Sequence, residues 1–191
     1  MRSGIMLRQA MMVNGTLYNS ECWQGTNVDK LVKTLCKPDE ALIRGLVSGH
    51  AKVPLEFLFL EAGCVPVPYI HACRRLVYLQ KDPAELLSRV YFAQKADSLP
   101  GDYCRLVAAD QEQFQICLSE EEVRNMSSRM YKKYIKEKVN KSAFAHLISV
   151  QQNHSKIRSI KYSKFDMQPY MKVICLVKTI SPSYLVFGHE R

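Results

Sequence analysis

The residues best suited to chemistry in this 191-residue chain are basic, and they are concentrated in one stretch. Residues 124–164 contain eleven lysines and arginines against a single acid, Glu137. Because the whole chain carries a net charge of +9, the remainder is close to neutral. A concentrated charge is typical of a binding surface, whereas a dispersed one serves general solubility. The pattern therefore predicts a polyanionic partner, with a merely solubilising surface as the alternative.

The chemistry of these side chains favours phosphate. Lys132, Lys133 and Lys136 fall within one turn or so of a predicted helix, where like charges repel unless an anion relieves them. An ammonium group contacts phosphate as a point charge and reads base edges poorly. We therefore predict binding to RNA, DNA or an RNA/DNA hybrid with little sequence preference. About four to six phosphate contacts would give a slope of roughly −3 to −5 for log K against log salt.

The basic stretch supplies most of the candidate phosphate contacts. They are Arg129, Lys132, Lys133, Lys136, Lys138, Lys141, Lys156, Arg158, Lys161 and Lys164. Aromatic residues are interleaved with them, and such rings stack on bases in single-strand binding proteins. Tyr131, Tyr134 and Tyr162 are the candidates for stacking, with packing in the core as the alternative for each.

The sequence contains no catalytic motif that we can identify. It has no adjacent pair of aspartates of the kind that holds two metal ions in polymerases, and no phosphate-binding glycine loop, HExxH helix or GxSxG turn. His71 and Cys73 are the nearest approach to a metal-ligand pair, but a zinc site needs three or four ligands. We therefore expect no enzyme activity, no cofactor and no small-molecule substrate, with an unrecognised enzyme as a weaker alternative.

Cysteine spacing and hydropathy indicate the compartment. The seven cysteines lie far apart without a CxxC pair, which is typical of reduced thiols inside the cell. Arg2 and Arg8 interrupt the apolar residues near the N-terminus, and no run of about 20 apolar residues follows. We expect an intracellular protein of the nucleus or cytoplasm, with no membrane association.

Apolar periodicity predicts a mainly α-helical bundle that contains a long basic helix. Helices are predicted over residues 5–18, 26–36, 39–49, 54–63 and 69–79, from residue 82, from about residue 102, and over residues 120–150. Pro38 should end the second helix. Ser119 and Glu122 form a capping box that starts the last helix, which would be roughly 45 Å long. Its predicted buried side is Val123, Met126, Met130, Tyr134, Ala143 and Leu147.

Residues 54–79 form the most strongly patterned region. Pro54 can start a helix and Gly63 can end it, while Pro66 and Pro68 favour an extended connector. In the helix that follows, one apolar stripe is predicted to face the core, so that the arginine pair points away from it. The stripe consists of Tyr69, Ile70, Cys73, Leu76 and Val77, and the arginines are Arg74 and Arg75.

This region resembles the part that follows the polymerase palm in reverse transcriptases of non-LTR, LINE-type retrotransposons. Residues 12–23, 39–46, 85–95 and 165–170 resemble neighbouring parts of the same proteins. The resemblance implies a thumb-like helical segment over residues 1–51 and a basic helical connection over residues 52–171. It also implies a fragment that grips template and primer but lacks the catalytic palm. Arg74, Arg75 and the lysines that follow would contact the nucleic-acid backbone.

The last twenty residues depart from this pattern. Residues 172–191 form an atypical tail rich in β-branched and aromatic residues, which favours extended structure. One interpretation is a tail translated in a shifted frame or past an intended boundary, in a relic of a mobile element. The alternative is a β-hairpin around Ser181, Pro182 and Ser183. For the chain as a whole, the alternative function is a helical protein-interaction module whose basic face binds an acidic protein.

Overall fold

The computed structural model of the chain describes residues 2–20, 23, 28–47, 53–79, 86–96, 102–162, 166 and 168. All regular structure in these residues is helical, which confirms the mainly α prediction. The elements are α1 (Arg2–Leu7), the π-helix η1 (Arg8–Thr16), α2 (Val28–Val47), α3 (Leu55–Ala62), α4 (Val67–Tyr78), α5 (Leu86–Ala96), α6 (Asp102–Gln113), α7 (Glu120–Asn125) and α8 (Ser128–Gln152). The predicted helix starts at residues 26 and 82 and the tail over residues 172–191 lie outside the described residues.

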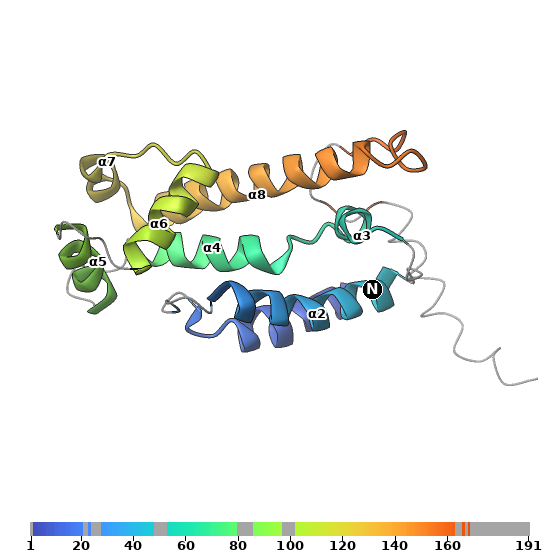
Figure 1. The fold of residues 1–191 in the computed structure, drawn as a ribbon, viewed down its shortest axis with the longest axis horizontal. Coiled ribbons are helices and arrows are strands. Elements are labelled where there is room, and N and C mark those ends of the chain that lie inside the picture. Colours follow the sequence, from blue (N-terminus) through green and yellow to red (C-terminus); the bar gives the residue numbers. More distant parts are fainter. Residues whose placement is uncertain are drawn as a thin grey trace, which may run out of the picture.

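Helix α4 occupies the middle of the bundle. Figure 1 shows it between α2 and α8, and it packs against both of them and against α6. Contact on more than one side explains why the predicted stripe is incomplete: Leu76 is buried together with Ala72, one turn before it on the same face, while His71 is buried on another side. Arg75 is also buried, so the prediction that it points away from the core is wrong. Its guanidinium forms an ion pair with Asp110 of α6, over 2.7 Å.

The turn between α3 and α4 largely follows the prediction. Pro54 precedes α3 as its N-cap, and Gly63 ends the helix with a φ of 63°, in the left-handed region that glycine adopts without strain. Pro66 is extended, with φ and ψ of −63° and 150°. Pro68, however, lies in the first turn of α4, where a proline removes no helical hydrogen bond. The connector is therefore shorter than predicted.

Helix α2 corrects the prediction of two helices separated at Pro38. The proline lies inside one continuous helix, with its own ring exposed. Buried residues on both sides of it, Val32 and Ile43, tie the two halves to the same layer. Asp39, directly after the proline, is held by a buried arginine of η1. Tertiary packing thus outweighs the loss of one backbone hydrogen bond.

The predicted long helix is divided into α7 and α8 at Met126 and Ser127. The capping box of Ser119 and Glu122 is confirmed at the start of α7. A second cap then interrupts the helix, because Ser127 Oγ accepts a hydrogen bond from the Met130 backbone N–H at 3.3 Å. Met130 itself is 63% exposed, contrary to the predicted buried side.

The buried residues of α8 recur every four positions: Tyr131, Ile135, Val139, Ala143, Leu147 and Gln151. Such a row forms a ridge that runs obliquely around the helix. Its first half packs with α4 and α6, through residues such as Leu76 and Tyr103. Its second half packs with α3 and α2, where Leu147 joins Leu58 and Ile43. The oblique row lets a single helix contribute to two cores.

The N-terminal helix also differs in register from the predicted one. After α1, the chain continues as η1, a helix closed by i→i+5 hydrogen bonds. Its buried residues Arg8 and Val13, with Leu17 after it, are spaced by five and four positions, which suits this wider turn. Met6, in the turn before η1, is 67% exposed.

Candidate nucleic-acid interface

A cleft of about 620 Å³ opens between η1, α4 and α8. Four basic side chains line it: Arg8 from η1, Arg74 from α4, and Lys132 and Lys136 from α8. No acidic residue is found among the described residues that line the cleft. The structure thus brings together three of the predicted phosphate contacts, Arg74, Lys132 and Lys136, although 58 positions or more separate the arginine from the lysines. This arrangement has the character of an anion-binding site.

Arg74 is fixed against the N-terminal helix. Its guanidinium donates hydrogen bonds to the backbone carbonyl of Leu17 and to Asn14 Oδ1, the latter at 3.1 Å. Both acceptors are uncharged, so these hydrogen bonds orient the guanidinium while its positive charge remains unneutralised by them. The expectation that Arg74 contacts an anion is therefore compatible with its position in the cleft.

Lys132 and Lys136 are exposed and lie one turn apart on α8. Their charges act on the thiol of Cys73, which lies in the same cleft. Burial raises the pKa of Cys73, and Lys136, Lys132 and Arg74 each oppose that rise. The three cations therefore converge on one region, while burial keeps the thiol protonated at neutral pH and makes it a poor nucleophile.

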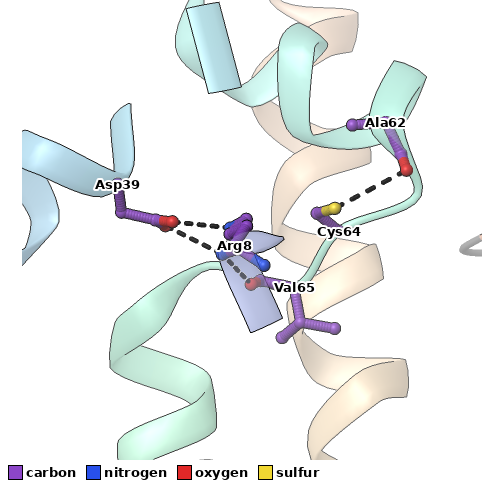
Figure 2. A network of polar contacts seen from close by, with 5 residues as sticks. All are labelled: Arg8, Asp39, Ala62, Cys64 and Val65. Carbon is purple, nitrogen blue, oxygen red and sulfur yellow. Dashed lines mark hydrogen bonds and ion pairs between the residues drawn. The ribbon is translucent and has the colours of Figure 1, made fainter. Parts of the chain in front are cut away.

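Arg8 shapes the wall of the cleft but adds little net charge to it. Figure 2 shows its guanidinium clamped by both carboxylate oxygens of Asp39, at 2.6 and 2.8 Å, and by the carbonyl of Val65 at 2.9 Å. Arg8 and Asp39 are 3% and 1% exposed. The same guanidinium lies over the Phe59 ring, 5.7 Å from its centroid. Arg8 thus joins η1 to α2 and to the connector before α4.

The aromatic residues of the cleft are not the predicted ones. Tyr131 belongs to the core, where its hydroxyl donates to the Leu76 carbonyl at 3.1 Å and burial raises its pKa to about 12. The hydroxyl of Tyr162 donates a hydrogen bond to the buried carboxylate of Glu61, and neither residue lines the cleft. Instead, Tyr69 and Tyr78 of α4 line the cleft.

The sequence did contain a signal for these residues. Ile70, Cys73, Arg74, Val77 and Tyr78 follow one another at helical spacing and all line the cleft. The same spacing predicted a face toward the core, because periodicity identifies a common face but does not reveal whether a neighbouring helix closes over it.

The remaining predicted contacts lie elsewhere. Lys138 and Lys141 line a second hollow, of about 440 Å³, together with Tyr134 and Glu137. There, Lys138 donates to the Gln115 carbonyl at 3.2 Å and lies 5.6 Å from the Tyr134 ring centroid. The basic stretch of α8 is therefore divided between two sides of the helix.

Other members of the predicted set are exposed outside both hollows. Arg129 is exposed in the first turn of α8, and Lys133 forms an exposed ion pair with Glu137 at 3.8 Å, which contributes little to stability. The segment after α8 is held by Gln151, whose side-chain amide donates to the carbonyls of Ile157 and Ile160. Its basic side chains, Lys156, Arg158 and Lys161, are exposed. Lys164 lies outside the described residues.

Within the described ranges, no group of three or more His, Cys, Asp or Glu side chains is arranged to hold a metal ion. None of the helices there combines the length and apolar character needed to span a membrane. Comparisons with protein-family models, with characterised proteins and with solved structures gave no match to this chain.

Proposed function

We propose that this chain binds nucleic acid through the phosphate backbone, with Arg74, Lys132 and Lys136 as the central contacts. The observation that supports the proposal best is the cleft in which these three cations converge, without an acidic side chain among its described lining. Lys132 and Lys136 repel each other across one turn, and a bound phosphate would relieve that repulsion. The orientation of Arg74 by neutral acceptors leaves its charge available to an anion.

The sequence resemblance narrows the proposal. A region similar to the thumb and connection of LINE-type reverse transcriptases would bind template and primer. An RNA template paired with a DNA primer is an RNA/DNA hybrid. We therefore propose that hybrid as a ligand, an intracellular site of action in the nucleus or cytoplasm, and no catalytic activity of the chain itself. Exposed Arg129, Lys156, Arg158 and Lys161 would add peripheral phosphate contacts.

The test is a fluorescence-anisotropy titration of a labelled RNA/DNA hybrid with the purified chain. The variant Lys132→Glu/Lys136→Glu should bind about ten- to a hundredfold more weakly near 0.1 M salt, because two phosphate contacts are lost. The matched control is Lys30→Glu/Lys33→Glu, which makes the same change of charge at exposed positions of α2. An equal loss of affinity in both variants would mean that binding depends only on net charge, and would contradict a site in the cleft.

A protein-interaction module whose basic face binds an acidic protein is the second candidate, and apolar side chains exposed near the N-terminus would extend its interface. Met6, Leu7 and Met11 are between 52% and 67% exposed, and Tyr18 is 74% exposed. Displacement of the hybrid by polyglutamate of equal total charge, as effectively as by unlabelled hybrid, would favour an acidic protein as the partner. Displacement by nucleic acid alone would favour the first proposal.

A further inference from the structure

We infer that the cleft between η1, α4 and α8 seats a nucleoside phosphate, with the phosphate on Arg74, Lys132 and Lys136 and the base against the apolar floor. The nucleotide would be either one unit of a single strand or a free molecule. This inference rests on the proposed function and deepens it, because it assigns a base-binding role to side chains that phosphate contacts alone leave unused.

The cleft lining combines two chemistries, as a nucleotide does. Beside the cations lie Ile70, Val77 and Tyr78 of α4 and Val139 of α8, and the side-chain amides of Gln9, Asn14 and Asn140 also line the cleft. A purely electrostatic grip on a duplex requires no such floor, since exposed lysines suffice for it. A volume of about 620 Å³ lies within the usual range of small-molecule sites, roughly 300–1,000 Å³.

The spacing along the helices also fits one nucleotide. Arg74 and Tyr78 are four residues apart on α4, so they share a face and lie about 6 Å apart along the axis. Lys132 and Lys136 repeat the same spacing on the facing helix, α8, which packs against α4. On α4, the cation that would contact the phosphate and the ring that would contact the base therefore lie one helical turn apart. The lysines that would also contact the phosphate lie on α8, which packs against α4.

Access to the floor distinguishes single strands from duplexes. In a duplex the bases are paired and stacked, and a base reaches a protein pocket only after it is extruded from the stack. In a single strand each base is available, and an aromatic side chain accepts any of the four. The inference therefore predicts that single strands of any sequence bind more tightly than duplexes, the RNA/DNA hybrid included, because a duplex uses only the phosphate contacts.

The decisive variant fills the cleft without changing its charge. Asn140 is exposed, lies one turn beyond Lys136 and lines the cleft, so Asn140→Trp places a bulky ring in it. Ser149→Trp, at an exposed position of the same helix outside the cleft lining, is the matched control. Circular dichroism of both variants verifies that the fold is retained. The probes are labelled dT12, the duplex dA12·dT12, and thymidine monophosphate as a competitor.

We expect wild-type protein and Ser149→Trp to bind dT12 more tightly than the duplex. Asn140→Trp should bind dT12 about tenfold more weakly, the effect of one lost stacking contact, with duplex binding unchanged. Competition by thymidine monophosphate would identify a site that accepts the free nucleotide. Competition by unlabelled dT12 alone would identify a site that needs the strand. Both outcomes support the inference.

Two results would overturn it. If Asn140→Trp binds dT12 as tightly as wild type, or if the duplex binds as tightly as dT12, no base occupies the cleft. Salt-sensitive binding that still requires Lys132 and Lys136 would then leave the proposed function standing without this refinement. Absence of binding to all three probes and to the RNA/DNA hybrid would remove both.

Discussion

At the scale of single residues, several ionisable side chains are buried, and two cases among them lead to predictions; the first is the Arg8–Asp39 ion pair. Its partners are 31 positions apart, and nothing in the sequence pairs them. A charge left in the interior without its partner is strongly destabilising, whereas replacing both partners by apolar groups is often neutral. The pair thus specifies how η1 and α2 meet, more than it adds to stability.

This reasoning predicts the outcome of a double-mutant cycle. Arg8→Met or Asp39→Leu alone should lower the free energy of unfolding by about 3–5 kcal/mol. The double variant should recover most of that loss, because no unpaired charge remains. Urea denaturation of the wild type, the two single variants and the double variant measures the loss caused by each substitution and the recovery in the double variant. Losses that simply add in the double variant would show that the two side chains act independently.

The second buried group is Glu61 of α3. One of its carboxylate oxygens accepts a hydrogen bond from Tyr162, whereas the other, Oε2, is buried and has no hydrogen-bond partner within the described residues. Burial raises the pKa of Glu61, and the hydrogen bond from Tyr162 opposes that rise. The folded state therefore holds the proton to a higher pH than the unfolded state does.

The sign of the pH dependence follows from that difference. Above about pH 4.5, the unfolded chain loses the Glu61 proton first, so stability falls as pH rises through the folded-state pKa. Glu61→Gln removes the titration and should flatten this part of the profile. Free energies of unfolding at about pH 4.5, 6 and 7.5 test it, with Glu112→Gln on the exposed side of α6 as the control. A decline that persists unchanged in Glu61→Gln would assign it to another group.

At the scale of elements, the sequence predicted most helices but not their interruptions. Periodicity and capping residues located α3, α4, α6 and the start of α7, because those signals are local. The continuity of α2 through Pro38 depends on Ile43 and Asp39 finding partners in other helices, which no local signal reports. The break before α8, where Ser127 is the N-cap, was not predicted, because the apolar pattern continues across it.

The cap at Ser127 has a measurable contribution. Ser127→Ala removes the acceptor for the Met130 backbone N–H and should lower the free energy of unfolding by about 1 kcal/mol. Ser128→Ala is the matched control, since that serine lies one residue further on, is also exposed, and is not the cap. Chemical denaturation compares the two variants. Equal stabilities of the two variants would show that α8 begins without help from the cap.

At the scale of the whole molecule, the concentration of charge was visible in the sequence, but its division between two sides of α8 was not. The buried row on α8 winds around the helix because it repeats every four residues, and α4 and α6 pack against one end of it and α3 against the other. That winding leaves Lys132 and Lys136 at the cleft and Lys138 and Lys141 at the second hollow. Arg75 was lost from the predicted set for a related reason, since α6 covers it and supplies Asp110.

The division predicts unequal contributions to the salt dependence of binding. For the RNA/DNA hybrid, log K against log salt between about 50 and 200 mM should have a slope of roughly −3 to −5. Lys132→Glu/Lys136→Glu should reduce the magnitude of that slope by about 1.4 to 1.8, the effect of two lost contacts.

Lys138→Glu/Lys141→Glu makes the same change of charge on the opposite side and should reduce the slope by less. Lys138 is already engaged with the Gln115 carbonyl and the Tyr134 ring, and its hollow also contains Glu137. A phosphate there would meet a carboxylate, whereas in the cleft it would meet converging cations. Equal slopes for the two double variants would mean that the hybrid responds to the total charge of α8, and that the cleft confers no preferred position on it.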